Sequence, residues 1–219
     1  MRLLLIRHGQ TPANVLGQLD TASPGPSLTR LGEQQAAMIP PAMQDRNIEA
    51  IFASTLLRTQ LTAEPLATDR ELDIQVLDGV QEIEAGSLEK RSDRASVQSY
   101  LEAVFAWGSG DLDARMPGGP DGNAFFARFD HAVASAAGEV GSGTAAVFSH
   151  GAAIRVWTTA RAGNVPYTFG ATHELDNTGV VELSGSPDDG WTLVSWAGRP
   201  VGGPQLVDQQ ADDPTGEPL

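Results

Sequence analysis

Residues 3–11 read LLLIRHGQT and carry the strongest structural signal in the chain. The uninterrupted apolar run at residues 3–6 predicts a buried strand. Such strands end at the edge of a sheet, where ligand crevices form. Gly9 removes the side chain just after the histidine and lets the backbone turn. We therefore expect Arg7 and His8 to be presented at a strand end.

This arginine–histidine pair suits phosphoryl chemistry. The guanidinium of Arg7 offers a planar fork of donors that matches phosphate oxygens, and a neutral His8 can act as a nucleophile. Together they predict a histidine that accepts a phosphoryl group. Because the tripeptide is short, the prediction depends on partners further along the chain.

A second strand-to-histidine junction lies late in the sequence. Residues 145–148 form an apolar run that leads through Ser149 into His150 and Gly151. If the two strands are neighbours, both imidazoles face one crevice. A cationic His150 would then bind a phosphoryl oxygen while neutral His8 attacks phosphorus. This division requires that the surroundings of the two histidines give them different pKa values.

Two segments between the histidines supply further candidates. In ASTLLRT at residues 53–59, Ser54 could cap a helix that carries Arg58 one turn along, at an end that favours anions. A surface arginine on an amphipathic helix remains the alternative. EIEAGSLE at residues 82–89 offers carboxylic acids that could protonate a departing oxygen. Each of these glutamates could equally be a solvated surface carboxylate.

Candidate strands and helices alternate along the chain, which predicts an α/β fold. The expected architecture is a three-layer α/β/α sandwich around a mostly parallel central sheet. The last two strands predict a hairpin that contributes an antiparallel edge strand. The strands are expected at 2–7, 50–53, 74–77, 145–149, 179–183 and 191–196. The helices are expected at 29–43, with Thr29 as cap, and at 55–67, 93–107, 123–137 and 152–162.

Length and composition fit one catalytic domain followed by a tail. The 219 residues are 41% hydrophobic, which is enough for one substantial core. We place the domain at residues 1–198. Residues 199–219 are rich in Pro, Gly, Gln and Asp with little apolar content, and they are predicted to form a flexible tail.

Charge and residue usage exclude several classes of function. A formal net charge of −14 argues against nucleic-acid binding, and the absence of cysteine excludes disulfides and thiolate metal sites. No secretory segment or apolar run of about 20 residues is visible, so we expect a cytoplasmic protein without a membrane partner. A phosphorylated small molecule would bind a local basic pocket. The sequence leaves open whether the protein forms a homodimer.

The four segments, in this order, resemble the histidine phosphatase superfamily in its phosphoglycerate-mutase-like branch. The resemblance covers roughly residues 1–185. The family's pattern R-H-G-[QE]-[ST]-x-x-N is met at 7–14, and S-x-L-x-R-[TA]-x-x-T-A is met at 54–63. The pattern E-x-x-x-G-x-x-E is met at 82–89 and S-H-G at 149–151.

The resemblance implies a two-step mechanism. His8 would attack the phosphoryl group and become a phosphohistidine, while Arg7, Arg58 and His150 hold the phosphoryl oxygens. Glu82 would protonate the leaving oxygen and then help water to attack, with Glu84 as a rival for this role. Substrate-binding residues would be Asn14, Thr11 and Gly151. The resemblance implies no metal and no cofactor, because two arginines and a histidine replace the cation.

The sequence therefore predicts a metal-independent phosphatase that hydrolyses a small phosphomonoester through His8. A phosphoglycerate-mutase-type phosphotransferase and a weakly catalytic, phosphate-binding regulatory protein remain as alternatives. Turnover of p-nitrophenyl phosphate in the presence of EDTA discriminates an enzyme from a binding protein. The loops at 19–27 and 117–121 depart from the family's pattern. Such loops select the substrate, so the resemblance does not identify it.

Overall fold

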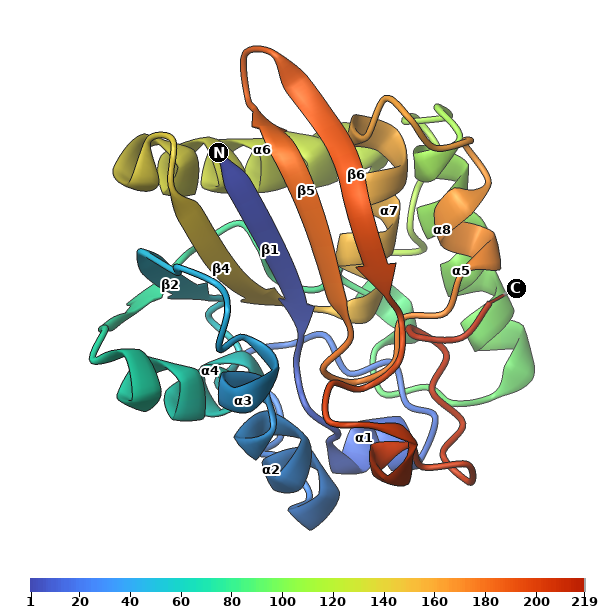
Figure 1. The fold of residues 1–219 in the computed structure, drawn as a ribbon. Helices are drawn as coiled ribbons and strands as arrows, with labels where there is room; N and C mark the ends of the chain where they lie inside the picture. The colour runs from blue at the N-terminus through green and yellow to red at the C-terminus, as the bar shows by residue number, and fades with distance from the viewer. Residues whose placement is uncertain (219) are drawn as a thin grey trace.

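A single six-stranded sheet forms the centre of the computed structural model, which describes residues 1–218 (Figure 1). The strands follow the order β3-β2-β4-β1-β5-β6. The first four in this order are parallel neighbours, whereas β5 runs antiparallel to both β1 and β6. The predicted mostly parallel sheet with an antiparallel edge is confirmed. The strands are β1 (Arg2–Arg7), β2 (Ala50–Ala53), β3 (Ile74–Val76), β4 (Thr144–Ser149), β5 (Val180–Ser186) and β6 (Gly190–Ala197).

Helices lie close to the predicted positions, with one exception. The helix predicted at 29–43 is two helices, α2 and α3, because Pro40 and Pro41 lack the N–H groups that a continuous helix needs. Thr29 caps α2 as predicted, since its hydroxyl accepts a hydrogen bond from Gly32 N at 3.0 Å. The helices are α1 (Pro12–Val15), α2 (Arg30–Ala37), α3 (Ile39–Ala42), α4 (Leu57–Arg70), α5 (Arg94–Gly108), α6 (Gly122–Val140), α7 (Gly151–Arg161) and α8 (Phe169–Thr172).

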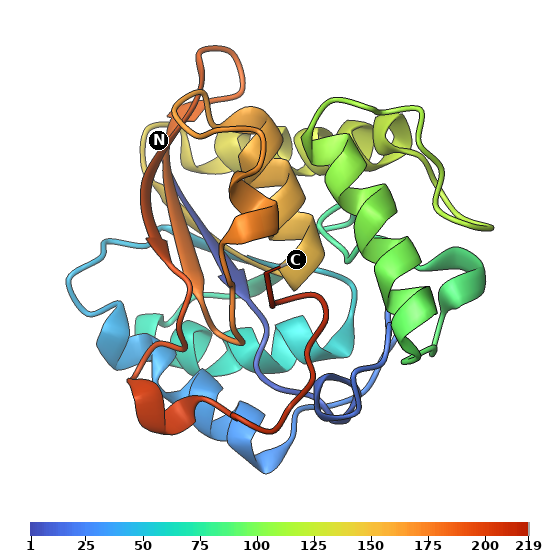
Figure 2. The ribbon, with the colours of Figure 1, turned by 90° about the vertical axis from the view of Figure 1, so that its right-hand side faces the viewer.

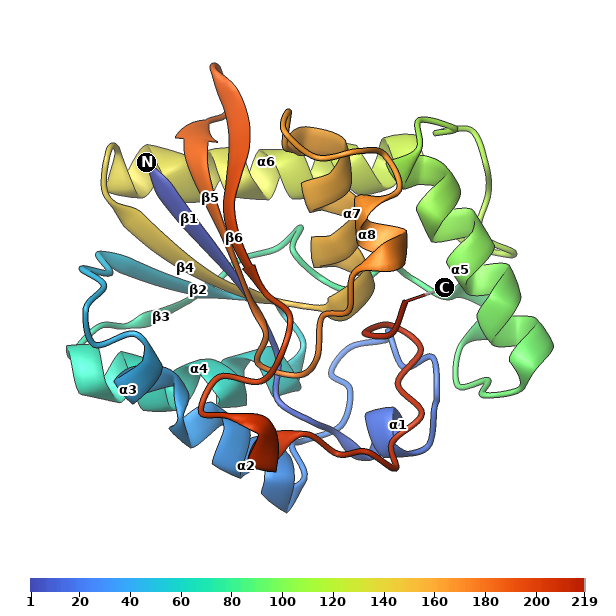
Figure 3. The same ribbon diagram turned by 45° about the vertical axis from the view of Figure 1, so that its right-hand side comes forward.

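Both faces of the sheet are covered, which explains the unbroken apolar run in β1 (Figure 3). Leu3 and Leu5 pack into a core with residues of α5, α6 and α7. Leu4 and Ile6 point to the other face and pack with residues of α3 and α4. A strand that is buried on both faces has no solvent side on which polar residues would alternate. The predicted three-layer sandwich is confirmed.

Strand register brings the candidate residues to one edge of the sheet. β1 and β4 run in parallel with Arg7 opposite Ser149, so His8 and His150 leave the sheet side by side. β2 ends nearby, with Ala53 opposite Phe148. Carboxyl ends of parallel strands are where ligand crevices form in such folds.

The end of the chain returns to the same edge of the sheet. Beyond β6 it passes a 3₁₀ turn at Pro204–Leu206 and crosses the carboxyl end of β1 near α1 (Figure 2). The flexibility predicted for residues 199–219 stays a prediction, while the contacts of this segment are described below. Across residues 1–218, no helix has both the length and the apolar character to span a bilayer.

Candidate active site

The imidazole of His8 is buried and fixed in one orientation. Its Nδ1 lies 2.8 Å from the backbone oxygen of Gly9. Because a carbonyl can only accept, Nδ1 carries the hydrogen and Nε2 keeps its lone pair. Burial, with the charges of Arg58 and Arg7, holds the pKa of His8 well below its ordinary value. His8 is therefore a neutral imidazole with a free nitrogen, as nucleophilic attack requires.

His150 faces His8, with ring centroids 5.2 Å apart and planes inclined by 60°. Its Nε2 lies 2.7 Å from Ser54 Oγ, and its Nδ1 has no hydrogen-bond partner within the described residues. Burial, Arg58 and His8 hold the pKa of His150 well below its ordinary value. The cationic His150 expected from sequence is thus absent from the free site. A phosphate dianion is the kind of group that would favour a proton there.

Two buried guanidiniums flank the histidines. Arg7 is the last residue of β1, and Arg58 lies in the first turn of α4. The Nη2 atom of Arg58 donates a hydrogen bond to Asp20 O at 3.0 Å. Arg58 is not the surface arginine that the sequence left open, since it is only 3% exposed.

Three buried polar atoms of these residues are unused. Arg7 Nε, Arg58 Nη1 and His150 Nδ1 lack hydrogen-bond partners among residues 1–218. Buried polar groups are nearly always satisfied, so such a cluster needs an explanation. Guanidinium and imidazole groups bind phosphate oxygens well, so these atoms are candidates for phosphate binding.

Glu82 shares a small pocket with His8 and Arg58. Its carboxylate accepts hydrogen bonds from the backbone N–H groups of Ile83 at 2.9 Å, Ala152 at 3.2 Å and Ala153 at 2.9 Å. The last two belong to the first turn of α7, which favours a negative charge. The remaining lining residues are Thr11, Ala13, Asn14, Gln18, Asp20 and Thr215.

Glu84, the rival acid, lies outside that pocket and is exposed. Strand alternation would have put Glu82 and Glu84 on one side. The chain forms no strand there, since β3 ends at Val76, and in this irregular segment Glu82 is buried whereas Glu84 is exposed. The geometry thus favours Glu82 for a role at the phosphate.

The loop that carries Glu82 is held by residues that the sequence did not single out for this role. Arg128 of α6 donates to the backbone oxygens of Gln81 at 2.9 Å and Glu82 at 2.8 Å. The hydroxyl of Tyr100 in α5 donates to Ile83 O at 3.0 Å. No local pattern could reveal these contacts, because each partner lies on a distant helix.

Of the three residues predicted to bind substrate, two line the His8 pocket and the third lies beside Arg7. Thr11 and Asn14 line the His8 pocket but also bind each other, with Thr11 N and Oγ1 both 2.9 Å from Asn14 Oδ1. Gly151 starts α7, where a Cβ atom would lie 3.0 Å from Arg7 Nε. Glycine there leaves space for the guanidinium. Substrate binding by these residues stays a prediction.

Ser54 has a different role from the predicted helix cap. The residue that caps α4 is Leu56, and it uses no side-chain hydrogen bond. The hydroxyl of Ser54 instead bonds Thr59 Oγ1 at 3.0 Å and the ring of His150. Ser54 therefore orients the second histidine, a role that its position before an apolar run could not reveal.

The match to a family of known proteins agrees with this arrangement. The family model of the histidine phosphatase superfamily (branch 1) matches residues 3–198. The chain belongs to this superfamily. The family predicted from the motifs is confirmed.

Relatives of this chain include both phosphatases and mutases by name. It is 42% identical over 212 residues to PE-PGRS family protein PE_PGRS11 of Mycobacterium tuberculosis, covering 90% of this chain and 36% of that protein. It is 33% identical over 135 residues to adenosylcobalamin/alpha-ribazole phosphatase of Escherichia coli, covering 61% and 66%. A probable phosphoglycerate mutase GpmB of Salmonella choleraesuis is 32% identical over 158 residues, covering 70% and 71%. The chain thus spans about a third of the first relative and just under two thirds of the second.

A solved structure confirms the fold of this chain. The native mycobacterial glucosyl-3-phosphoglycerate phosphatase superposes with a TM-score of 0.75 at 23% identity, over 90% of this chain and 99% of that one. At this identity the likeness concerns the fold alone.

Proposed function

We propose that this chain is a metal-independent phosphatase that hydrolyses small phosphomonoesters through a phosphohistidine on His8. One observation carries the proposal. His8 keeps Nε2 free in a pocket that it shares with Arg58 and Glu82, and His150 faces it with ring centroids 5.2 Å apart. A nucleophile, phosphate-binding charges and an acid thus meet in one place.

In the first step, His8 Nε2 attacks phosphorus, and the bond to the leaving oxygen breaks as the N–P bond forms. Arg7, Arg58 and His150 stabilise the charge on the remaining oxygens. Glu82 gives its proton to the leaving oxygen. Three backbone N–H groups hold its carboxyl group in place beside the pocket.

In the second step, water attacks the phosphohistidine. Glu82, now a carboxylate, takes a proton from this water as the O–P bond forms. The N–P bond breaks, and its electron pair returns to His8 Nε2. Inorganic phosphate leaves, and the site is ready for another turnover.

Two fixed guanidinium charges support a mechanism without a metal ion. Arg7 and Arg58 are buried where they meet the phosphate, and burial strengthens their attraction for an anion relative to water. Burial, with the charge of Arg7 opposing those of Glu82 and Asp20, lowers the pKa of Arg58, yet a guanidinium stays charged at neutral pH. The charge that a metal would supply is thus present in the side chains.

A second pocket beside the first favours hydrolysis over phosphoglycerate mutation. It has a volume of about 440 Å³ and shares Glu82 with the His8 pocket, so it suits the leaving group. Its charged lining is mostly acidic and consists of Asp78, Glu82, Glu84, Glu89 and Arg128. An anionic leaving group such as glycerate would be repelled there. Uncharged or cationic leaving groups fit better.

Rapid-quench labelling tests the proposal. A phosphomonoester labelled at phosphorus should transfer its label to His8 as an acid-labile, base-stable phosphoramidate. His8→Ala should lose the label and nearly all turnover, whereas His131→Ala, at an exposed position of α6, should keep both. EDTA should leave turnover unchanged. A label on Ser or Asp, or turnover that survives in His8→Ala, would refute the proposal.

A further inference from the structure

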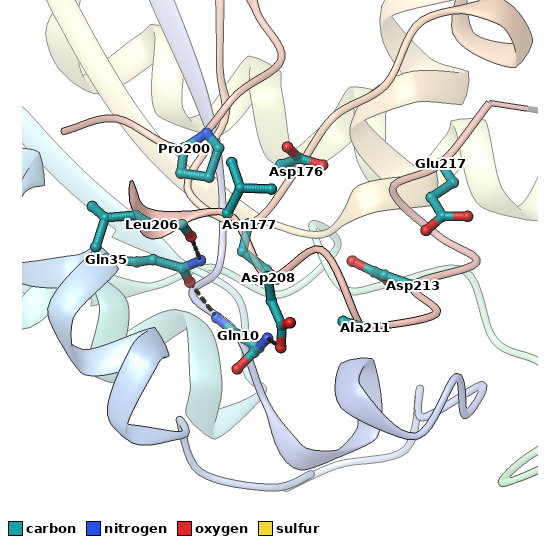
Figure 4. A pocket seen from close by; sticks show the side chains of 11 residues that line it. Gln10, Gln35, Asp176, Asn177, Pro200, Leu206, Asp208, Ala211, Asp213 and Glu217 are labelled. Carbon is teal, nitrogen blue, oxygen red and sulfur yellow. Dashed lines mark hydrogen bonds between the residues drawn. The ribbon is translucent and has the colours of Figure 1, made fainter. Parts of the chain in front are cut away.

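The C-terminal segment, defined here as residues 204–217, is bound to the edge of the sheet that carries the nucleophile (Figure 2). Gln35 Nε2 donates to Leu206 O at 2.9 Å, and Gln10 Nε2 donates to Asp208 Oδ2 at 2.9 Å (Figure 4). Further along, Leu175 N donates to Gly216 O at 2.8 Å. These contacts lead the segment past the residues that follow β1.

Within this segment, Asp213 forms an ion pair with Arg7. Asp213 Oδ2 lies 2.6 Å from Arg7 Nη2, and the two side chains are 13% and 0% exposed. The other oxygen, Oδ1, accepts from Asn14 Nδ2 at 3.1 Å and from Thr215 Oγ1 at 3.2 Å. Arg7 Nη2 also donates to Thr215 Oγ1 at 2.9 Å. Two residues of the segment thus hold one nitrogen of the guanidinium.

Among the described residues, two of the three guanidinium nitrogens of Arg7 have hydrogen-bond partners and the third has none. Nη1 donates to Leu175 O at 2.7 Å, and Nη2 is held by Asp213 and Thr215. Nε has no partner in the described part of the chain. The contacts of Nη1 and Nη2 fix the plane of the guanidinium. Nε is then the nitrogen that remains to bind a phosphoryl oxygen.

Asp213 lies outside the pocket that His8 lines. It lines a separate cavity with Gln10 and Asn177 (Figure 4), and it is not among the residues that line the His8 pocket. Thr215, two residues later, does line the His8 pocket. The carboxylate therefore meets Arg7 outside the His8 pocket, which Arg7 itself does not line, while the threonine forms part of the pocket wall.

Charge gives a second reason for a carboxylate at this position. Arg155 is also buried, and burial together with the charge of Arg7 lowers the pKa of Arg155 to about 10, an effect that Asp213 opposes. Arg155 Nη1 donates to Thr215 O at 2.9 Å. A buried cation without a counter-ion is strongly destabilised, and two adjacent ones more so. Within residues 1–218, Asp213 supplies the carboxylate that pairs with Arg7.

We propose that Asp213 is a positioning residue for Arg7 and that residues 213–216 complete the catalytic pocket. These four residues, rather than the whole C-terminal segment, then belong to the active site. This inference rests on the proposed function, because it concerns the fork that presents Arg7 Nε to the phosphoryl group. A guanidinium that loses one of the partners that orient it stabilises the transition state less well.

The test compares Asp213→Asn with Asp212→Asn. Asp212 is exposed and adjacent, so its variant makes the same change in charge one residue away. Asp213→Asn should lower kcat by about tenfold or more and change KM by less than about twofold, as expected when a transition-state interaction is lost. Asp212→Asn should match the wild type, and Asp213→Glu should recover part of the loss. Thermal unfolding should show that all variants are folded.

Two further readouts separate positioning from a general structural role. The loss in Asp213→Asn should be equal for p-nitrophenyl phosphate and for glycerol 2-phosphate, since Arg7 acts on the phosphoryl oxygens and not on the leaving group. In an Arg7→Lys background, Asp213→Asn should change kcat by less than about twofold, because the two residues act as a unit.

Several results would overturn the inference. Asp213→Asn could match Asp212→Asn, or its kcat could rise, which would make the carboxylate an obstruction. The inference would also be contradicted if Asp213→Asn lowered kcat in the Arg7→Lys background by the same factor as in the wild type. These outcomes differ from a failure of the proposed function, in which the wild type neither hydrolyses the ester nor becomes labelled on His8.

Discussion

The rings of His8 and His150 face each other with centroids 5.2 Å apart, and one nitrogen of each ring is already occupied. Gly9 O holds Nδ1 of His8, and Ser54 Oγ holds Nε2 of His150. One nitrogen on each ring is thereby left for a ligand. The parallel register of β1 and β4 produces this pairing, because both histidines directly follow strand ends that lie side by side.

We predict that Ser54→Ala lowers kcat by about tenfold, equivalent to about 1.4 kcal/mol of transition-state stabilisation. The change leaves His150 Nε2 without its partner in a buried site, so the ring loses its orientation. Steady-state kinetics with p-nitrophenyl phosphate measures the effect. Ser186→Ala, in the β5–β6 hairpin, serves as a control and should leave kcat unchanged. Full activity in Ser54→Ala would show that His150 needs no such support.

Glu82→Gln should produce a loss that depends on the leaving group. Nitrophenolate hardly needs a proton, whereas an alkoxide does. We therefore expect a small loss for p-nitrophenyl phosphate and a loss of about 10²-fold or more for glycerol 2-phosphate. Glu84→Gln is the matched control and should change both rates by less than about twofold. If Glu84→Gln showed the larger loss, the acid role would pass to Glu84.

Stability should fall as pH falls below about 6.5, where unfolded histidines gain protons. Burial and nearby arginines hold the pKa values of His8 and His150 well below that value in the folded state. The unfolded state then binds more protons, so the free energy of unfolding rises with pH, by up to about 1.4 kcal/mol per pH unit for each histidine.

Denaturant unfolding at pH 7 and pH 5 measures this dependence. His8→Asn removes one of the two groups, so its stability should change less steeply with pH than that of the wild type. His131→Asn, at an exposed position, should leave the slope unchanged. Equal slopes in all three proteins would show that His8 titrates normally in the folded state.

Phosphate release should exceed phosphoglycerate interconversion. The acidic leaving-group pocket disfavours a bound glycerate anion, so the phosphohistidine should pass to water. We expect negligible exchange between 3- and 2-phosphoglycerate and no need for a bisphosphate primer. Coupled assays for both products, run on one preparation, compare the two rates. Mutase turnover faster than phosphate release would reverse the assignment.

Local signals in the sequence were sufficient to predict the fold and most of the candidate site. The apolar runs before His8 and His150 predict strands because a strand buried on both faces needs continuous apolar residues. Each histidine follows its run directly, so its place at the sheet edge needs no long-range information. Glu82 entered the prediction through a resemblance to the family, since its own surroundings in the sequence do not separate it from Glu84.

Tertiary structure decided the contacts that hold the site together. Ser54 binds His150, Arg128 binds the loop of Glu82, and Asp213 binds Arg7. Each pair joins segments that are distant in sequence, and neither periodicity nor capping patterns extend over such separations. By itself the sequence therefore determined where the strands end and which chemical groups follow them. Only the packed chain decided which of these groups are held, buried and charged, because burial and hydrogen bonding depend on the whole surroundings of a side chain.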